Sequence, residues 1–385
     1  MHLGPFLMSK CKFMPKNLHK SNFFYKFATK LKLTTLLITQ IMKKISMYLS
    51  AALVAFAATL VSCSDIDNPA TSGVSSEADF ITAVQAGGTV VLGKNANITL
   101  TEGITAGPNL KLIGYPDAPA KITFGEQGIT TSSSIILSHV DIDATALTKP
   151  LIQLDNVTLA EGQKAVTIDN ISFNDVEVLG LPYQLIYANK QKYIVKSLSV
   201  ENSILGVDGT KKKTIFDFNG GGLPEALTIN NSTIYSIPTC NSNGGFFSTQ
   251  SGSKIDDLGA EGFVLSITNS TLYNITNART VNSLRQNSQD TQKFIVKNSI
   301  IVDCGKNGQF LKGLNAGSPG KDANWEVKEN VFNFGGAVSA EQKIGSTEEN
   351  IVGSIDVIVT FNDVENGDFT QYSANAGDPR WLPQE

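Results

Sequence analysis

The sequence predicts an all-β protein folded as a single-stranded, right-handed parallel β-helix (a solenoid) with a short capping helix at its N-terminal end. Three observations support this fold class. An apolar pattern returns seven times at a spacing near 32 residues, each repeat alternates as a strand does, and the repeats carry no helical periodicity. The 385-residue chain is 41% hydrophobic and 17% charged, so it can bury a sizeable core.

Each repeat is centred on one polar residue, with apolar residues four and two positions before it and three positions after it. Leu198, Val200 and Leu205 stand in this way around Asn202. The odd step of five across the centre requires a bend, and asparagine tolerates the left-handed conformation of such a bend. Each repeat is therefore strand, corner, strand and a variable return. The seven centres are His139, Asn170, Asn202, Asn231, Asn269, Asn298 and Glu329.

The polar centres have a structural interpretation. Asparagines stacked at one corner are expected to bond to each other along the solenoid, which satisfies their buried amides. His139 occupies the same register, and the sequence assigns it no catalytic partner serine or cysteine and no paired ligand, so we interpret it as a corner residue.

Both ends of the β-helix, assigned to residues 77–385, have sequence signals. Ser76-Glu77-Ala78-Asp79 is similar to a capping box, and Gly87-Gly88 ends the short helix that it begins. This helix is expected to cap the open N-terminal end of the core. At the other end, Ile355–Phe361 is predicted as a last strand, and the tail Ala376–Trp381 is expected to close over the core.

The segment before the β-helix resembles an export signal. Residues 42–62 combine Lys43 and Lys44 with an apolar run, and Leu60-Val61-Ser62-Cys63 is similar to a lipobox. The run is shorter than the ~20 residues that span a bilayer, which disfavours the alternative of a transmembrane anchor. We therefore predict lipidation at Cys63, a tether over 63–76, and an outer-membrane or cell-surface location. Residues 1–41 are interpreted as an upstream extension from a misplaced start codon.

Charge excludes one large class of partner. Beyond residue 62, 22 basic residues stand against 35 acidic ones, which gives −13. Nucleic-acid binders need a basic face, so no nucleic-acid partner is expected. Cys240 and Cys304 lie in repeats separated by one other, about 9.5 Å apart by sheet spacing, which is too far for a disulfide. Both are predicted to be free thiols.

The chain also resembles a family of known proteins. The segment Phe80–Gly88, the Asn-Ser turns and the end Gly377-Asp378-Pro379-Arg380-Trp381 are similar to pectate-lyase-like β-helix lipoproteins of gut-type bacteria, the domains of unknown function 4957 and 5123. The resemblance extends over residues 77–385. It implies the β-helix fold and a glycan-related setting, and it supplies no catalytic residues.

The residues bear on two classes of polysaccharide-cleaving enzyme. Polygalacturonase-like hydrolysis is rejected, because the chain has Asp256-Asp257 but neither a Gly-His-Gly nor an Arg-x-Lys signature. A polysaccharide lyase needs a basic residue and a cation, commonly calcium held by carboxylate or amide oxygens. Arg279 and Arg285 are its weak candidates, with Lys293 and Asp303 nearby. The alternative is that the two arginines only pair with acidic residues of the protein's own surface. No set of metal ligands is assigned.

Two surface features suggest contact with sugars. Tyr235 and Tyr273 share a register in adjacent repeats and are expected to point outward, as a flat apolar face for carbohydrate. Stiffening of the sheet by ring stacking explains them equally well. Lysines form a local basic patch suited to a sulfated or uronic glycan, or else simply solvated turns: Lys190, Lys192, Lys196 and Lys211 to Lys213.

Three functions follow as expectations. The first is a lipid-anchored surface protein that binds polysaccharide within a glycan-utilisation system, beside other outer-membrane uptake proteins. The second is a calcium-dependent lyase of an acidic polysaccharide. The third is an adhesin or structural surface protein. The glycan itself is not identified.

Overall fold

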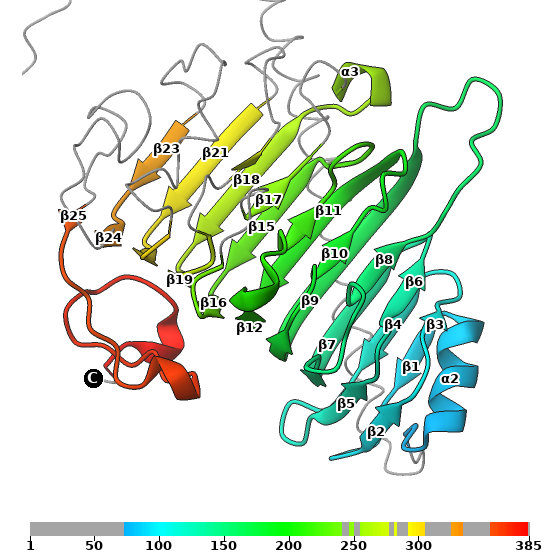
Figure 1. Ribbon diagram of the computed structural model, residues 1–385, viewed down its shortest axis with the longest axis horizontal. Helices are drawn as coiled ribbons and strands as arrows, with labels where there is room; N and C mark the ends of the chain where they lie inside the picture. Colours follow the sequence, from blue (N-terminus) through cyan, green and yellow to red (C-terminus); the bar gives the residue numbers. More distant parts are fainter. Residues whose placement is uncertain are drawn as a thin grey trace, which may run out of the picture. The chain divides into compact units, whose positions relative to one another are not determined.

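The computed structural model describes residues 73–240, 246–249, 255–276, 281–282, 292–304, 325–333 and 355–383. It divides the chain into two units, Met1–Ser72 and Gly73–Glu385, and every described residue belongs to the second. The predicted extension, signal peptide and lipidated Cys63 thus lie outside the described residues. In the second unit, parallel strands stack turn upon turn (Figure 1), which confirms the predicted parallel β-helix.

Each complete turn contributes strands to three faces, because the return also carries a short strand. The first face consists of β1 (Thr89–Val91), β4 (Leu110–Ile113), the first parts of β7 (Ile135–Asp143) and β9 (Val166–Leu181), β11 (Tyr193–Glu201), β14 (Leu223–Pro224), β15 (Ala226–Asn230), β18 (Phe263–Thr268), β21 (Gln292–Lys297) and β23 (Trp325–Lys328).

The second face consists of β2 (Asn97–Leu100), β5 (Ala120–Phe124), the later parts of β7 and β9, β12 (Ile204–Asp208), β16 (Thr233–Ile237), β19 (Thr271–Tyr273), β22 (Ile300–Val302), β24 (Val331–Asn333) and β25 (Ile355–Asp356). The third face consists of β3 (Ile104–Thr105), β6 (Ile129–Thr131), β8 (Ile152–Leu154), β10 (Ile186–Tyr187), β13 (Phe216–Asp217), β17 (Phe247–Ser248) and β20 (Val281–Asn282). Short helical segments complete the described elements: α2 (Glu77–Ala86), α3 (Ile255–Leu258), η2 (Gly209–Lys211), η7 (Val364–Asn366) and η8 (Pro379–Trp381).

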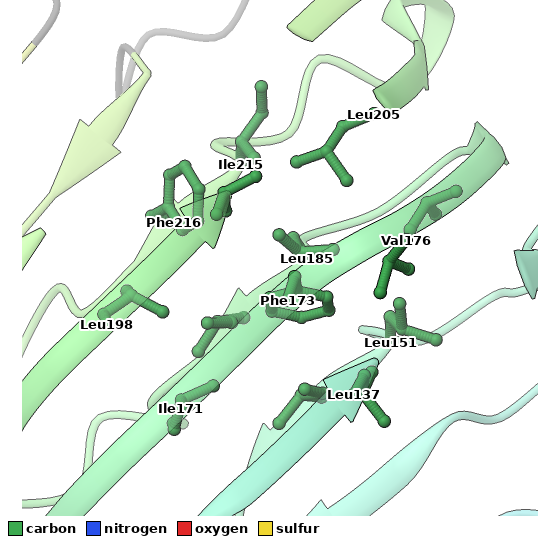
Figure 2. Packing of buried hydrophobic residues seen from close by; sticks show 14 of the residues in the cluster. Leu137, Leu151, Ile171, Phe173, Val176, Leu185, Leu198, Leu205, Ile215 and Phe216 are labelled. Atoms are coloured by element: carbon green, nitrogen blue, oxygen red, sulfur yellow. The ribbon is translucent and has the colours of Figure 1, made fainter. Parts of the chain in front are cut away.

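The core is one continuous interior lined by all three faces. Figure 2 shows Leu137, Ile171, Phe173 and Leu198 from successive turns gathered with Leu185 and Phe216 of the return segments. The predicted inward residues are buried wherever their side chains are described, except that Val166 is only partly buried. Apolar ladders that exclude water along the whole stack are the main source of stability in such a fold.

The corner between the first and second faces has the predicted left-handed conformation in turn after turn. Its residues have φ between 47° and 60°, and they are His139, Asp175, Asn202, Asn231, Asn269, Asn298 and Glu329. Six of the seven predicted centres are therefore confirmed. Asn170 is not a corner residue: Ile135 and Leu137 pair with Ile171 and Phe173, which places Asp175 opposite His139.

The misassignment at Asn170 has a simple cause. Ile171, Phe173 and Val178 surround Asp175 with the same apolar spacing that the pattern requires, so the pattern fits this strand in two registers five residues apart. The strand is unusually long because Thr167 and Ile168 pair with Ile194 and Val195 before the corner is reached. Asn170 and Asp175 both satisfy the pattern, and Asp175 is the corner residue.

Two polar ladders follow the corner. The predicted amide ladder is confirmed in part. Asn231 donates to Asn202 and Asn298 to Asn269, whereas Asn202 and Asn269 donate to Asn174 and Asn230, which precede the corner. The next position carries a buried hydroxyl ladder that the sequence analysis did not predict. The hydroxyl oxygen of each serine accepts the backbone N–H of the preceding turn at 3.0–3.2 Å, at Ser203, Ser232, Ser270 and Ser299.

The N-terminal end agrees with prediction. Ser76 caps α2 by accepting the N–H of Asp79, and Gly87 ends the helix with φ of 76°. Phe80 and Val84 of this helix are fully buried in the core. The predicted last strand is present only as the two residues of β25, which pair with β24. Cys240 and Cys304 are both buried and are not joined by a disulfide bond, as predicted.

Candidate functional site

The C-terminal segment, residues 357–383, lies on the outer side of the second face (Figure 1). It packs there through a small apolar cluster made by Ile300, Val302 and Val331 of the strands with Val359 and Ala376 of the segment. The tail had been expected to close over the end of the core. That expectation is wrong, because outward apolar side chains in β22 and β24 give the segment a lateral surface to cover.

The sequence Asp378-Pro379-Arg380 fastens this segment to the corner. The Asp378 side chain is fully buried and accepts the hydroxyl of Thr233 at 2.7 Å. The guanidinium of Arg380 bonds to Asp378 and also donates to the carbonyl oxygens of Ser203 and Asn231, at 2.8 and 3.3 Å. One arginine therefore joins two turns of the β-helix to the tail.

Tyr235 and Tyr273 pair in register on β16 and β19, as predicted. They do not stand free, however, and the expected open face is wrong. The ring centroids of Tyr235 and Tyr273 lie 5.0 and 5.8 Å from that of Phe369, and Tyr273 also meets Phe361 edge-on. Phe369 is fully buried by these contacts. The two tyrosines therefore seat the C-terminal segment, and their direct contact with sugar stays a prediction.

A charged cluster occupies the neighbouring turns of the second face, where β5, β7 and β9 lie side by side. Lys121, Asp141 and Glu177 are register partners on these three strands and point outward in one row, about 4.8 Å apart between strands. At the adjacent corner, Nδ1 of His139 lies 2.7 Å from a carboxylate oxygen of Asp175. His139 thus has a partner that was not predicted, because the pattern had placed Asn170 and not Asp175 at the corner of the next turn.

The acids of this cluster influence each other's ionisation. Partial burial raises the pKa of Asp141, and the negative charge of Asp175 raises it further. Burial likewise raises the pKa of Glu177, with a smaller contribution from Asp141, while Arg380 opposes the shift. Tyr235 is linked to the same group, since burial and then the charge of Glu177 raise its pKa. Raised carboxyl pKa values of this origin are typical of functional sites.

A hollow lies between the C-terminal segment and the corner of the later turns. We call it the Tyr372 hollow. Its volume is about 520 Å³, and its lining includes Asn298, Glu329, Tyr372, Ser373 and Asn375. Tyr372 is 81% exposed, so its ring is accessible at the border of the hollow. An aromatic ring is therefore held beside amide, hydroxyl and carboxylate side chains.

The remaining predicted residues are spread over the molecule. Lys293 is exposed in β21 on the first face, while Arg279 and Arg285 lie outside the described residues. The basic patch is divided, because Lys196 forms an ion pair with Glu225 at 2.8 Å on the first face. In the described part of the chain, no three acidic, histidine or cysteine side chains are grouped as metal ligands. No helix among the described residues is long and apolar enough to cross a membrane.

Comparison with protein-family models supports the DUF4957 part of the resemblance noted in the sequence. Residues 92–237 match the family model described as Domain of unknown function (DUF4957). This range includes the charged cluster and Tyr235, and it ends before the C-terminal segment. Comparison with curated proteins gave no match.

Proposed function

We propose that this chain, a DUF4957 protein over residues 92–237, binds polysaccharide, and that the Tyr372 hollow is a sugar subsite. One observation carries the proposal: a tyrosine that is 81% exposed borders a hollow of about 520 Å³ whose lining combines polar side chains with Val331, Ala374 and Ala376. A volume of roughly 300–1,000 Å³ is common for small-molecule sites.

The chemistry of the lining suits a sugar. A sugar ring presents apolar C–H groups on its faces and hydroxyl groups around its edge. The exposed ring of Tyr372 offers a surface for the first, while the side chains of Asn298, Glu329 and Asn375 can accept or donate hydrogen bonds to the second. The β-helix adds a rigid scaffold on which several sugars of one chain can lie along the stack.

The cellular setting of the proposal rests on the sequence. The lipobox-like Leu60-Val61-Ser62-Cys63 supports a lipid anchor at Cys63, followed by the short tether. We therefore propose a lipid-anchored protein at the outer membrane or cell surface, where it holds glycan for neighbouring uptake proteins. Labelling cells with a fatty-acid analogue and comparing the wild type with Cys63→Ala tests the anchor.

Glycan-array binding by the full-length protein in detergent tests the sugar subsite. Tyr372→Ala is expected to lower the affinity for the bound glycan at least tenfold. Ile358→Ala is the matched control, because Ile358 belongs to the same segment and is 82% exposed, yet does not line the hollow. Unchanged binding in both Tyr372→Ala and Glu329→Gln would overturn the proposal.

A second candidate function is cleavage of the glycan at the charged cluster. Asp141 and Glu177 are carboxyl groups on neighbouring strands, and burial raises the pKa of both. A raised pKa suits the general acid at a glycosidic bond, and the second carboxyl would have to act in its ionised form. The missing polygalacturonase signatures exclude that class of hydrolase but not this different pair. New reducing ends that disappear in Glu177→Gln are expected if the pair is catalytic.

The products formed when the protein is incubated with glycan also distinguish the lyase and adhesin alternatives. A lyase using Arg279 or Arg285 with calcium would instead produce unsaturated uronates, detected by ultraviolet absorbance. An adhesin would produce neither product and bind no free glycan.

A further inference from the structure

The third face carries a row of polar side chains on its outer side. Ile152, Ile186 and Phe216 of β8, β10 and β13 are fully buried. The residues that follow them, Gln153, Tyr187 and Asp217, alternate to the outside and are register partners on adjacent strands. Sheet spacing puts neighbours in this row about 4.8 Å apart. A partly exposed aromatic ring thus lies between an amide and a carboxylate.

The carboxylate of Asp217 is held in a defined orientation. One of its oxygens accepts the Gln184 amide at 3.3 Å, and the other accepts the backbone N–H of Asn219 at 3.1 Å. A carboxylate has about four acceptor positions, so Asp217 retains capacity for further hydrogen bonds, such as those from hydroxyl groups. Burial raises the pKa of Asp217, while Lys213 and Lys190 both oppose that shift, which places two cations around this one acid.

Lys213 is positioned at one border of the row, just before β13. Its Nζ lies 5.0 Å from the ring centroid of Tyr183, a cation–π contact. The backbone around it is fixed, since Lys212 ends η2 in the left-handed conformation and the Lys213 carbonyl accepts the thiol of Cys240 at 3.3 Å. The lysine run 211–213 is therefore built into a capped turn.

Lys190 stands at the opposite border, just after β10. It also has a left-handed backbone, with φ of 58°. It packs closely on the next turn, where a Cβ added to Gly220 would lie 3.2 Å from its Cγ. Gly220 itself has φ of 86°, so a side chain there is disfavoured on two counts. The two lysines are held on both sides of Tyr187 and Asp217.

We propose that this row is a second binding site, specific for an acidic sugar that carries a carboxylate or sulfate group. Tyr187 offers the ring face, Asp217 and Gln153 face the hydroxyl groups, and Lys190 and Lys213 neutralise the acid group. The chain beyond residue 62 is strongly acidic, so two fixed cations on this face provide a local attraction for an acidic sugar. The site is independent of the Tyr372 hollow.

Calorimetric titration of the full-length protein in detergent tests the site with three probes of equal length. These are an oligogalacturonate, which carries carboxylates, a chondroitin sulfate oligosaccharide, which also carries sulfates, and a neutral galactan oligosaccharide. We expect one or both acidic probes to bind. The Lys190→Ala, Lys213→Ala double variant should lose at least tenfold in affinity and show a weaker dependence on salt.

Matched variants separate the roles of charge and ring. Lys94→Ala is the control for charge, because Lys94 forms an equivalent cation–π contact with Tyr115 at 4.9 Å in a distant turn. Tyr187→Phe should keep the affinity, whereas Tyr187→Ala should lose it. Preference for the oligogalacturonate or for the sulfated probe identifies the acid group.

Two outcomes would overturn the proposal: equal binding of the neutral and acidic probes, or wild-type affinity in the double lysine variant. Tyr372→Ala should leave binding of the acidic probe unchanged. Failure of the sugar subsite at Tyr372 and failure of this second site are therefore distinguishable.

Discussion

Phe369→Ala is the most informative single perturbation of the C-terminal segment. Phe369 is fully buried, and its ring contacts four aromatic neighbours at centroid distances of 5.0–6.1 Å. Removing a buried phenylalanine costs about 3–5 kcal/mol, from lost transfer free energy and the cavity that remains. Because four ring contacts are lost together, we expect about 4 kcal/mol, in the middle of that range.

This loss is expected to act on the segment before it acts on the β-helix. The core ladders do not include Phe369, so residues 357–383 should open locally while the stacked turns persist. Limited trypsin digestion measures this directly, since Arg380 is the only lysine or arginine in the segment and is bonded to Asp378 in the folded state. Loss of the peptide that follows Arg380 should become much faster in the variant.

Tyr372→Ala supplies the control for this experiment. Tyr372 lies in the same segment but is mostly exposed, so its removal should change stability by less than about 0.5 kcal/mol. If Phe369→Ala and Tyr372→Ala were cleaved at the same rate, and both as slowly as the wild type, the assignment of Phe369 as the centre of this packing would be refuted.

Two further predictions concern ionisable groups. Burial raises the pKa of the Cys304 thiol to about 12, and Cys240 is also buried. Neither cysteine should therefore react with a thiol reagent at pH 8 until the chain is unfolded. Mass spectrometry of labelled peptides checks this, and labelling of the folded protein would contradict it. The folded pKa of Glu177 is raised, so its contribution to stability is present below the unfolded value of about 4.3 and is lost as pH rises through the folded one. Glu177→Gln should therefore raise the urea midpoint at pH 7.5 and not at pH 3.5, and an equal change at both values would exclude this explanation.

The repeat carried most of the predictable information about the fold. Strand spacing and the corner residues were readable because each turn must present apolar side chains to one interior and bend at one polar position. Asn202, Asn231, Asn269 and Asn298 confirm this. Asp175 was missed because two registers of the same strand satisfy the apolar spacing equally well. Only pairing with the neighbouring turn decides between them.

The candidate sites were less predictable for a different reason. The row of Asp141 and Glu177, and that of Tyr187 and Asp217, exist only because neighbouring turns are in register, and the lengths of the returns vary. The outward direction of Tyr235 followed from strand parity, but nothing in that parity shows that Phe369, 134 residues later, covers it. Tyr372 belongs to a segment without repeats, so neither repeat register nor strand parity predicts where its side chain points.

The hydroxyl ladder gives the molecule a direction of assembly. The backbone N–H of each corner serine is satisfied by the side chain of the following turn, from Ser203 through Ser232 and Ser270 to Ser299. The last rung among the described residues is Asn330, whose amide oxygen accepts the N–H of Ser299 while its nitrogen donates to the carbonyl oxygen of Val296. In a chain that emerges from its N-terminal side, the corner N–H of each newly formed turn is therefore satisfied only when the following turn has been added.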